Sequence, residues 1–218
     1  MPAGIPRRRS NLDRGVVIQP DSSILFPMDP ATVAVYEGRA NEWIERRGEA
    51  TDGLGRRFRE QLGSGPAADL GCGAGRYLGE IGPPVVGVDV AAAMLRLAQR
   101  SGLPLVRADL EDLPFAPGVL AGAFARHSYL HLPKARLGRA LSEVRRVLRP
   151  RGLLLMTLIE GTYEGHDLPG DDFGGRYFAC WTAPELVRIL EASGFTDVGV
   201  ERVGRHRRDH DLLATARR

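Results

Sequence analysis

The stretch Asp69-Leu70-Gly71-Cys72-Gly73-Ala74-Gly75-Arg76-Tyr77 contains three glycines at alternate positions, after a short apolar run and before a helical pattern. One glycine permits a sharp turn from strand to helix, one lets a ligand approach the backbone without meeting a Cβ atom, and one allows the helix to pack closely on the strand. The spacing predicts the first strand, loop and helix of a nucleotide-binding α/β domain. A tight turn without a ligand is the alternative that this stretch alone leaves open.

Two segments downstream each end in an acidic residue. Val85 to Asp89 has the pattern of a short buried strand, and Asp89 lies eighteen residues after Gly71, close to the spacing of the ribose-binding acid in dinucleotide-binding folds. Leu105 to Asp109 repeats this form and leads into Leu110-Glu111-Asp112-Leu113-Pro114-Phe115. Both acids are therefore predicted at the ends of strands, in positions that suit contacts with a nucleoside.

The glycine loop and the two acids together resemble a class I S-adenosylmethionine-dependent methyltransferase. More narrowly, the chain is similar to small-molecule methyltransferases with a DxGCGxG first loop and a DxxxLPF third loop. The resemblance covers roughly residues 69–195, including an expected fourth strand at 121–127 and a last helix with its glycine cap at 182–195. It departs from the family at Arg151, which replaces one of the two glycines that usually follow the proline.

The resemblance and the alternation of strand and helix patterns predict an α/β fold. We expect a Rossmann-like, seven-stranded, mostly parallel sheet with helices on both faces and a carboxyl-terminal antiparallel hairpin. Helices are expected at residues 31–48, 56–62, 76–81, 91–101 and 134–148, and the hairpin strands at 198–203 and 212–216. Residues 31–218 are expected to form one methyltransferase domain, with residues 31–65 over the cofactor mouth and 160–181 as a substrate loop. Residues 1–30 are expected to form a flexible arm.

The resemblance implies S-adenosylmethionine as the cofactor. Asp89 would accept hydrogen bonds from both ribose hydroxyls, and Asp109 would accept one from the adenine amino group. The amide of Leu110 would bind a ring nitrogen. The Asp69 region would face the amino-acid tail, and Tyr36 is a candidate for the tyrosine that the family places near the ligand, although core packing is equally open for it. The cofactor residues implied in this way are Tyr36, Asp69, Gly71, Cys72, Gly73, Gly75, Asp89, Val90, Met94, Asp109, Leu110 and Arg126.

Candidate catalytic groups follow the fourth strand. His127, Tyr129 and His131 are expected to cluster beside the sulfonium, and His127 is the first choice for a general base. His131 matches a histidine that is common in the family whatever the substrate, so packing or positioning is equally open for it. No spacing of cysteine and histidine suggests zinc, and no metal site is expected. Cys72 and Cys180 are expected to be reduced and structural.

The methyl acceptor is not specified by these patterns. The expected loop at residues 160–181 is rich in acidic and aromatic residues, which suit a cationic or aromatic acceptor. The hairpin loop at 204–211 carries arginines and histidines, which suit a carboxylate or a phosphate. The two segments point to different acceptor classes, and both stay open.

Charge distribution bears on whether the acceptor is a nucleic acid. The chain has 218 residues, 43% hydrophobic content, a net charge of +3 and a pI of about 9.2. Residues 1–15 and 198–218 each carry a net +3, so residues 16–197 sum to −3. The expected cofactor-binding body is thus slightly acidic, which favours a small-molecule acceptor. No apolar run is long enough for a membrane span or a secretory signal, so a cytoplasmic protein without membrane partners is expected.

Other function classes remain compatible with the sequence. A tRNA or rRNA methyltransferase would use the basic ends, and steep salt dependence of RNA binding would identify it. A non-catalytic S-adenosylmethionine-binding or regulatory protein would carry the same cofactor residues. A nicotinamide enzyme is disfavoured, because no second nucleotide-binding half follows the first.

Overall fold

The computed structural model describes residues 28–48, 50, 52–204 and 210–218. The helices are α1 (Pro30–Gly38), α2 (Ala40–Arg47), α3 (Leu54–Leu62), α4 (Leu78–Ile81), α5 (Ala92–Ala98), α6 (Lys134–Val147) and α7 (Ala183–Ala192), with short 3-10 helices η2 (Gln99–Ser101) and η3 (Tyr129–His131). The strands are β1 (Ala67–Leu70), β2 (Val85–Asp89), β3 (Leu105–Arg107), β4 (Leu120–Arg126), β5 (Leu148–Ile159), β6 (Glu164–His166), β7 (Tyr177–Ala179), β8 (Thr196–Gly204) and β9 (His210–Arg217). The expected flexible arm at 1–30 therefore lies almost wholly outside the described residues, as does most of the hairpin loop at 204–211.

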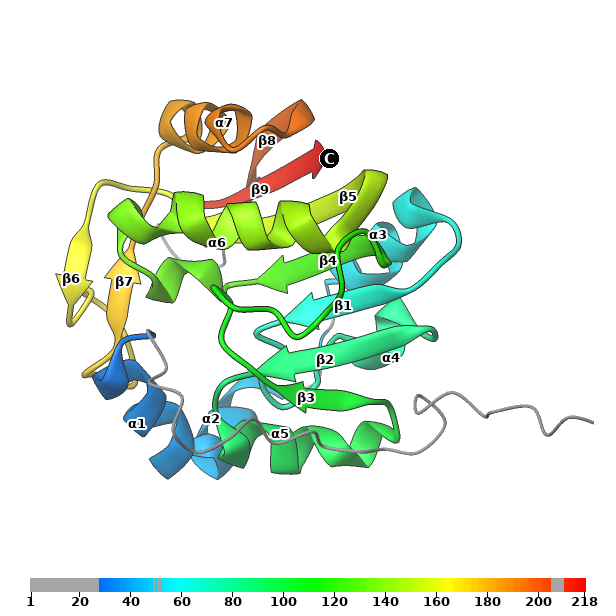
Figure 1. The fold of residues 1–218 in the computed structure, drawn as a ribbon. Helices are drawn as coiled ribbons and strands as arrows, with labels where there is room; N and C mark the ends of the chain where they lie inside the picture. Colours follow the sequence, from blue (N-terminus) through cyan, green and yellow to red (C-terminus); the bar gives the residue numbers. More distant parts are fainter. Residues whose placement is uncertain (1–27, 49, 51, 205–209) are drawn as a thin grey trace, which may run out of the picture.

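The main sheet has seven strands in the order β3-β2-β1-β4-β5-β9-β8 (Figure 1). Strands β1 to β5 pair in parallel, and β9 pairs antiparallel with both β5 and β8, so β8 runs in the same direction as the parallel strands. This confirms the predicted mostly parallel sheet with its carboxyl-terminal antiparallel hairpin. The strand order reverses between β1 and β4, and ligands of open α/β sheets bind at the carboxyl ends of strands at such a point.

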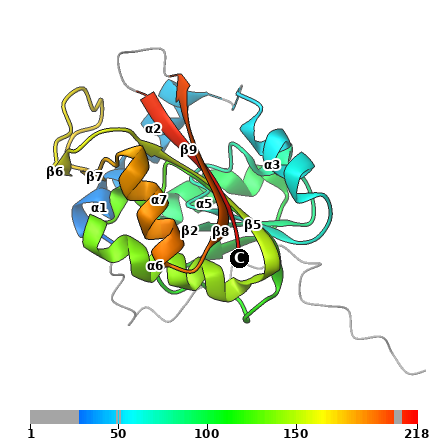
Figure 2. The same cartoon turned by 90° about the horizontal axis from the view of Figure 1, so that it is seen from above.

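Helices cover both faces of the sheet, as predicted (Figure 2). Because successive side chains of a strand point to opposite faces, β5 contributes to two cores. Leu154 and Met156 pack with the buried side chains of α6 and α7. Leu153 and Leu155 pack with Phe58 of α3 and with α4 and α5. Both faces of the sheet are thus buried, so a ligand site is expected at the edge where the parallel strands have their carboxyl ends.

The expected helix at residues 31–48 is two helices, and this part of the prediction was wrong. The break is at Arg39, whose backbone leaves the helical region at φ −125° and ψ 24°. Gly38 is a poor helix former, and Asp29 caps the start of α1 by accepting a hydrogen bond from the Thr32 amide at 2.8 Å. The turn lets α2 direct Trp43 toward a small cluster with α5.

Residues 160–181 contain a two-stranded antiparallel hairpin, β6–β7, that lies beside α1 (Figure 1). The Tyr177 amide donates to Thr32 Oγ1 at 2.8 Å, and Arg47 of α2 forms an ion pair with Asp172 at 2.6 Å. We call α1, α2 and residues 160–181 the cover. The cover is a single hydrogen-bonded unit built from two distant parts of the chain, and it lies at the carboxyl edge of the sheet.

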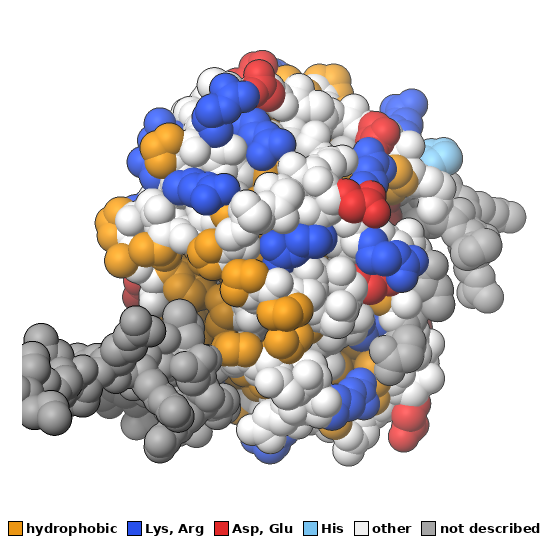
Figure 3. All heavy atoms as spheres, turned by 90° about the vertical axis from the view of Figure 1, so that its right-hand side faces the viewer, with side chains coloured by type: hydrophobic (Ala, Val, Ile, Leu, Met, Phe, Trp, Pro, Cys, Tyr) orange, Lys and Arg blue, Asp and Glu red, His pale blue; other side chains and the backbone are white. Residues whose placement is uncertain are grey.

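The opposite edge of the sheet, where the parallel strands begin, faces the viewer in Figure 3. Hydrophobic side chains gather in the lower left of that view, with arginine or lysine side chains above them.

Within the described residues, no helix has both the length and the apolar character that crossing a bilayer requires.

Arg151, which replaces the family's usual glycine, has a strained backbone. Its φ is +61°, in the left-handed region that L-residues other than glycine adopt at a cost of roughly 1–2 kcal/mol. Its side chain is exposed, and its amide donates to the Arg218 carbonyl at 2.9 Å, a bond that glycine would keep. Arg151→Gly removes this backbone strain, but glycine loses more conformational entropy on folding, which cancels part of the gain. We therefore expect the substitution to raise the free energy of unfolding by about 0.5–1 kcal/mol. Urea denaturation checks this, and an unchanged or lower midpoint would contradict it.

Candidate active site

A pocket lies at the carboxyl ends of β1, β2 and β4, at the point where the strand order reverses. It is lined by Met28, Tyr36, Gly71, Asp89, Val90, Met94, Leu110, Ser128 and His131. The fold thus gathers Tyr36 from α1, the glycine loop, the acid after β2 and the expected His131 around one space. The cavity is about 50 Å³, smaller than the roughly 300–1,000 Å³ of typical small-molecule sites.

The three glycines of the first loop meet different surroundings. A Cβ atom on Gly71 would lie 2.3 Å from Ser128 Cβ, so only glycine lets the β1 and β4 loops approach this closely. A Cβ on Gly73 would meet nothing within 4 Å, which leaves open space beside the backbone. A Cβ on Gly75 would lie 3.1 Å from Ala98 Cβ, where α5 packs against the loop. Gly71 thus serves the close approach of two loops, Gly73 faces open space, and Gly75 serves packing against α5.

Asp89 stands at the end of β2 and holds the glycine loop in place. Its Oδ2 accepts a hydrogen bond from the Gly73 amide at 2.8 Å, and its Oδ1 accepts one from the Ala91 amide at 2.9 Å. Burial raises the pKa of this carboxyl to about 6, although the two amide donors act in the opposite direction. Each oxygen keeps further acceptor capacity toward the pocket.

Asp69, at the end of β1, and Ser128, after β4, carry buried oxygens that lack partners. Within the described residues, neither Asp69 Oδ2 nor Ser128 Oγ has a hydrogen-bond partner. Burial, and secondarily the charge of Asp89, raises the pKa of Asp69 to about 8. Unpaired buried polar atoms are costly, and a ligand that brings N–H donors or positive charge would satisfy both of them.

Apolar side chains line part of the pocket, and a buried carboxylate directly precedes one of them in the sequence. Val90, Met94 and Leu110 line the pocket, and Asp109 lies directly before Leu110 with 3% exposure. Asp109 Oδ1 accepts from the Glu111 amide at 2.8 Å, and Oδ2 accepts from the Met28 amide at 3.1 Å. Asp109 Oδ2 is therefore already engaged by the backbone at Met28. The sequence carried no signal for Met28, because no local pattern links it to a residue eighty-one positions away.

His131 connects the pocket to the cover. Its Nδ1–H donates to the Tyr177 carbonyl at 2.7 Å, and its Nε2 lies 2.8 Å from Tyr36 Oη. Arg176 Nη1 donates to the same Tyr36 oxygen at 2.9 Å. Burial lowers the pKa of His131 to about 3, so the imidazole is neutral at physiological pH.

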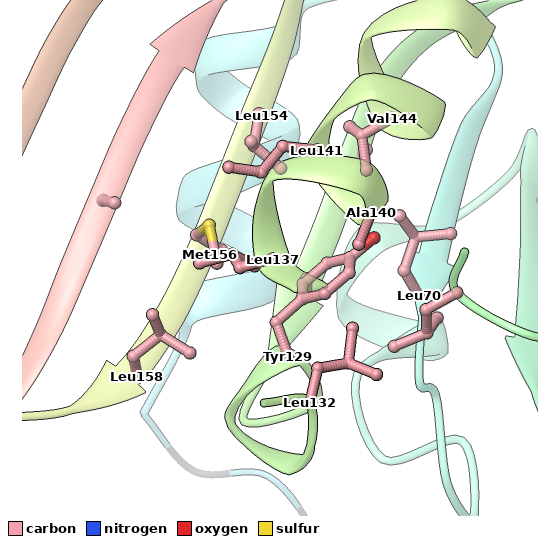
Figure 4. Packing of buried hydrophobic residues seen from close by; sticks show 14 of the residues in the cluster. Leu70, Tyr129, Leu132, Leu137, Ala140, Leu141, Val144, Leu154, Met156 and Leu158 are labelled. Atoms are coloured by element: carbon pink, nitrogen blue, oxygen red, sulfur yellow. The ribbon is translucent and has the colours of Figure 1, made fainter. Parts of the chain in front are cut away.

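Of the three catalytic candidates, His131 lines the pocket and Tyr129 does not. Tyr129 is 1% exposed, and its ring lies among Leu70, Leu132 and Ala140 in the core (Figure 4). The Tyr129 side chain, just after β4, lies under α6 and does not face the pocket. Packing against apolar side chains therefore sets its orientation. Desolvation raises the pKa of its phenol, which keeps it protonated.

His127 and Arg126 belong to a second polar group beside the pocket. His127 Nε2 lies 2.9 Å from Asp211 Oδ2, and the His127 backbone adopts φ +54°, an uncommon conformation that is concentrated at functional sites. Arg126 forms ion pairs with Asp52 and Asp211, both at 3.3 Å, and donates to Tyr77 Oη at 3.1 Å. Neither residue lines the pocket. The sequence had placed Asp211 only in a hairpin loop, because its approach to β4 depends on the antiparallel pairing of β9.

Cys72 lies in the core cluster with Leu78 and Phe124, and burial raises its thiol pKa well above the usual value. Cys180 is buried as well. Across residues 28–48, 50, 52–204 and 210–218, no three histidine, cysteine, aspartate or glutamate side chains converge in a group that could hold a metal ion.

Comparison with known proteins agrees with this geometry. Residues 68–156 match the family described as a methyltransferase domain. Malonyl-[acyl-carrier protein] O-methyltransferase of Legionella pneumophila is 35% identical over 101 residues, 42% of this chain and 35% of that protein. The tRNA (carboxymethyluridine(34)-5-O)-methyltransferase of Arabidopsis thaliana is 29% identical over 133 residues, 58% of this chain and 33% of that protein. The chain thus spans about a third of the length of these two relatives.

A solved structure extends the likeness beyond the matched domain. Burkholderia thailandensis 1,6-didemethyltoxoflavin-N1-methyltransferase, with 1,6-didemethyltoxoflavin and S-adenosylhomocysteine bound, superposes with a TM-score of 0.64 and 28% identity. The match covers 84% of this chain and 87% of that one. With the sheet order, the glycine loop and the acids after β2 and β3, these likenesses support the class I S-adenosylmethionine-dependent methyltransferase that the sequence indicates.

Proposed function

We propose that this protein binds S-adenosylmethionine in the pocket at the carboxyl ends of β1, β2 and β4 and transfers its methyl group to a small-molecule acceptor. The observation that carries the proposal is the pair of buried oxygens without a hydrogen-bond partner, Asp69 Oδ2 and Ser128 Oγ, of which Ser128 lines the pocket. An amino-acid tail with an ammonium group supplies the donors that these oxygens lack. The apolar wall and the free acceptor capacity of Asp89 suit the nucleoside half.

Each part of the pocket has a distinct task in this proposal. Asp89 accepts hydrogen bonds from the ribose hydroxyls, and charge-assisted bonds of this kind contribute about 1.5–3 kcal/mol each. Val90, Met94 and Leu110 pack against the adenine ring, and Asp109 accepts from its amino group. The bound sulfonium supplies an activated methyl group. The protein's contribution is alignment, which can lower a barrier by roughly 7–11 kcal/mol when the geometry is good.

His127 is the better candidate for a general base among the three residues considered. Both nitrogens of His131 are engaged, and a pKa of about 3 leaves it without useful basicity, so it acts as a positioning group. Tyr129 lies in the core. His127 directly precedes the pocket residue Ser128. Arg126 Nη1 lies 2.9 and 2.7 Å from its two ring nitrogens, so proton uptake would require this arginine to move away, and Asp211, 2.9 Å from Nε2, would then stabilise the imidazolium.

The small-molecule assignment is supported by the likeness to an N-methyltransferase whose structure holds a heterocyclic acceptor, over 87% of that chain. The tRNA methyltransferase of Arabidopsis thaliana favours RNA as a second candidate acceptor. The two candidates differ in salt dependence: RNA binding should fall steeply with ionic strength, whereas binding of a neutral metabolite should not. Titration with bulk tRNA at about 50 and 200 mM salt separates them, since loss of affinity by orders of magnitude would favour RNA.

The first experiment is calorimetric titration with S-adenosylmethionine, S-adenosylhomocysteine and NAD in parallel. We expect both adenosyl ligands to bind and NAD not to bind. An acceptor screen with radiolabelled methyl donor then tests transfer, beginning with heterocyclic amines and carboxylates. Binding of NAD, or of none of the three, would overturn the proposal.

Binding of S-adenosylmethionine is expected to release protons. Burial raises the pKa of Asp69 to about 8 and of Asp89 to about 6, and a cationic ligand favours their ionised forms. Affinity should therefore rise as the pH increases through 6 to 8, and protons should leave the protein at pH 7. Calorimetry in two buffers with different ionisation enthalpies measures this release. Asp69→Asn is the matched control that should reduce it, and a pH-independent affinity without proton release would contradict the prediction.

A further inference from the structure

The start of α5 belongs to the pocket wall, yet α5 has no side-chain cap of its own. Val90 and Met94, which flank the beginning of the helix, both line the pocket. The residue at the cap position is Ala91, whose methyl group cannot accept a hydrogen bond from the amides of the first turn. Alanine is among the least favoured residues at this position. The amides of Ala92 and Ala93 therefore need acceptors from another part of the chain.

Glu37 of α1 supplies both acceptors, and α1 lies beside the start of α5 at the carboxyl edge of the sheet (Figure 1). Its Oε1 accepts from the Ala92 amide at 2.6 Å, and its Oε2 accepts from the Ala93 amide at 2.9 Å. Arg107 of β3 adds to this contact, because its Nη2 lies 3.6 Å from Glu37 Oε1 and its Nε donates to the Val90 carbonyl at 2.8 Å. The segment between β2 and α5 is thus held by α1 and by β3.

Glu37 acts from behind the pocket wall. It does not line the pocket, whereas its neighbour Tyr36 does, as do Asp89 and Val90. Asp89 accepts a hydrogen bond from the Ala91 amide at 2.9 Å, so three successive amides of this segment are bound by two carboxylates, one in the pocket lining and one outside it. Glu37 therefore fixes the path of the backbone behind the pocket without occupying the space of a ligand.

We propose that Glu37 is a positioning residue that holds residues 89–94 in the conformation that binds the nucleoside half of S-adenosylmethionine. This inference rests on the proposed function. Without an acceptor for its first amides, the segment would also adopt conformations in which Asp89 and Val90 are displaced. The apparent affinity for a ligand falls in proportion to the fraction of the protein in the binding conformation. Because Tyr36 directly precedes Glu37, the same carboxylate also fixes the position of α1 at the pocket.

The test begins with the affinities for S-adenosylmethionine and S-adenosylhomocysteine, measured by calorimetry on the full chain. We expect Glu37→Ala to weaken both about threefold to thirtyfold, the range that corresponds to the loss of a helix cap. Glu37→Asp keeps the charge but is one methylene shorter, so it should lose the two hydrogen bonds and bind as weakly as Glu37→Ala. Glu37→Gln keeps the length and one acceptor oxygen, and its affinities should lie between those of the wild type and of Glu37→Ala.

A second substitution separates positioning of the pocket wall from simple attachment of α1. The backbone of Ala91 is extended, at φ −83° and ψ 111°, and a serine there would accept a hydrogen bond from an amide of the first turn. Ala91→Ser should therefore recover most of the affinity lost in Glu37→Ala, and it should change the affinity of the wild type little. If Glu37 only attaches α1, a local cap cannot replace it. A double variant that binds as weakly as Glu37→Ala would overturn the inference.

Glu42→Ala is the matched control, because it removes the same type of side chain from the cover. Glu42 forms ion pairs with Arg39 and Arg46 and, within the described residues, has no hydrogen bond to α5. We expect this variant to bind both ligands as the wild type does. If Glu42→Ala and Glu37→Ala weaken binding equally, any loss of charge from the cover has this effect and the inference fails.

Hydrogen exchange of the Ala92 and Ala93 amides gives a readout that needs no ligand. Exchange should be faster in Glu37→Ala than in the wild type and should slow again when Ala91→Ser is added. Unchanged exchange and unchanged affinity in Glu37→Ala would contradict the inference. Thermal melting confirms that each variant is folded, and Glu37→Gln serves where Glu37→Ala does not fold. Absence of binding of either ligand to the wild type would instead count against the proposed function.

Discussion

Asp89→Ala is expected to weaken the binding of S-adenosylmethionine at least about a hundredfold while the protein stays folded. The substitution removes the acceptor of two charge-assisted hydrogen bonds, together worth roughly 3–6 kcal/mol. The substitution also removes the hydrogen bonds from the Gly73 and Ala91 amides, which would destabilise the fold. This loss is offset because the buried carboxylate, whose ionised form is unfavourable there, is removed as well. Calorimetry gives the affinity, and thermal melting gives the stability.

Two companion variants sharpen this experiment. Asp112→Ala removes an exposed carboxylate near the same edge of the sheet and should bind S-adenosylmethionine as the wild type does. Asp89→Asn keeps the shape and one acceptor oxygen but loses the charge. Its affinity for S-adenosylmethionine should therefore lie between those of the wild type and of Asp89→Ala. If Asp89→Ala binds normally, the pocket is not the cofactor site.

Gly71→Ala is expected to lower the free energy of unfolding by roughly 2–5 kcal/mol. Its φ of +74° costs an L-residue about 1–2 kcal/mol, and overpacking costs about 1–3 kcal/mol more. The overpacking arises because the new Cβ would lie 2.3 Å from Ser128 Cβ, far inside van der Waals contact. Denaturant unfolding measures the change.

Gly73→Ala is the matched variant for Gly71→Ala, two residues further along the same loop. Its φ is +53°, but its Cβ would meet nothing within 4 Å, so only the backbone cost of about 1–2 kcal/mol applies. We expect a folded protein with weakened binding, because the methyl group enters the space proposed for the ligand. Equal destabilisation at Gly71 and Gly73, or unchanged binding in Gly73→Ala, would show that the loop is only a turn.

The strand ends of the pocket were predictable because their residues are set by local sequence. A glycine loop directly follows its strand, and Asp89 and Leu110 follow theirs, so parallel pairing brings them to one edge. Six of the implied cofactor residues line the pocket: Tyr36, Gly71, Asp89, Val90, Met94 and Leu110. Cys72 and Gly75 serve packing, and Arg126 lies in the second polar group.

The cover was only partly predictable, because it joins segments that are distant in sequence. The pattern at residues 31–48 indicated helix but not the break at Arg39. The contact between Arg176 and Tyr36 links residues 140 positions apart, and no periodicity encodes such a pairing. The same holds for His127 and Asp211, which meet only because β9 inserts antiparallel between β5 and β8.

The sequence by itself therefore determined the alternation of strands and helices in the main sheet, the three-glycine loop, and the acids that end β2 and follow β3. These features depend on hydrophobic periodicity and on backbone conformations that specific residue types allow. Only the tertiary structure decided which candidates face the pocket. Tyr129 and His131 are two residues apart, yet one turns into the core under α6 and the other toward the cover. Long-range packing and hydrogen bonding set that choice, because the local sequence leaves both orientations open.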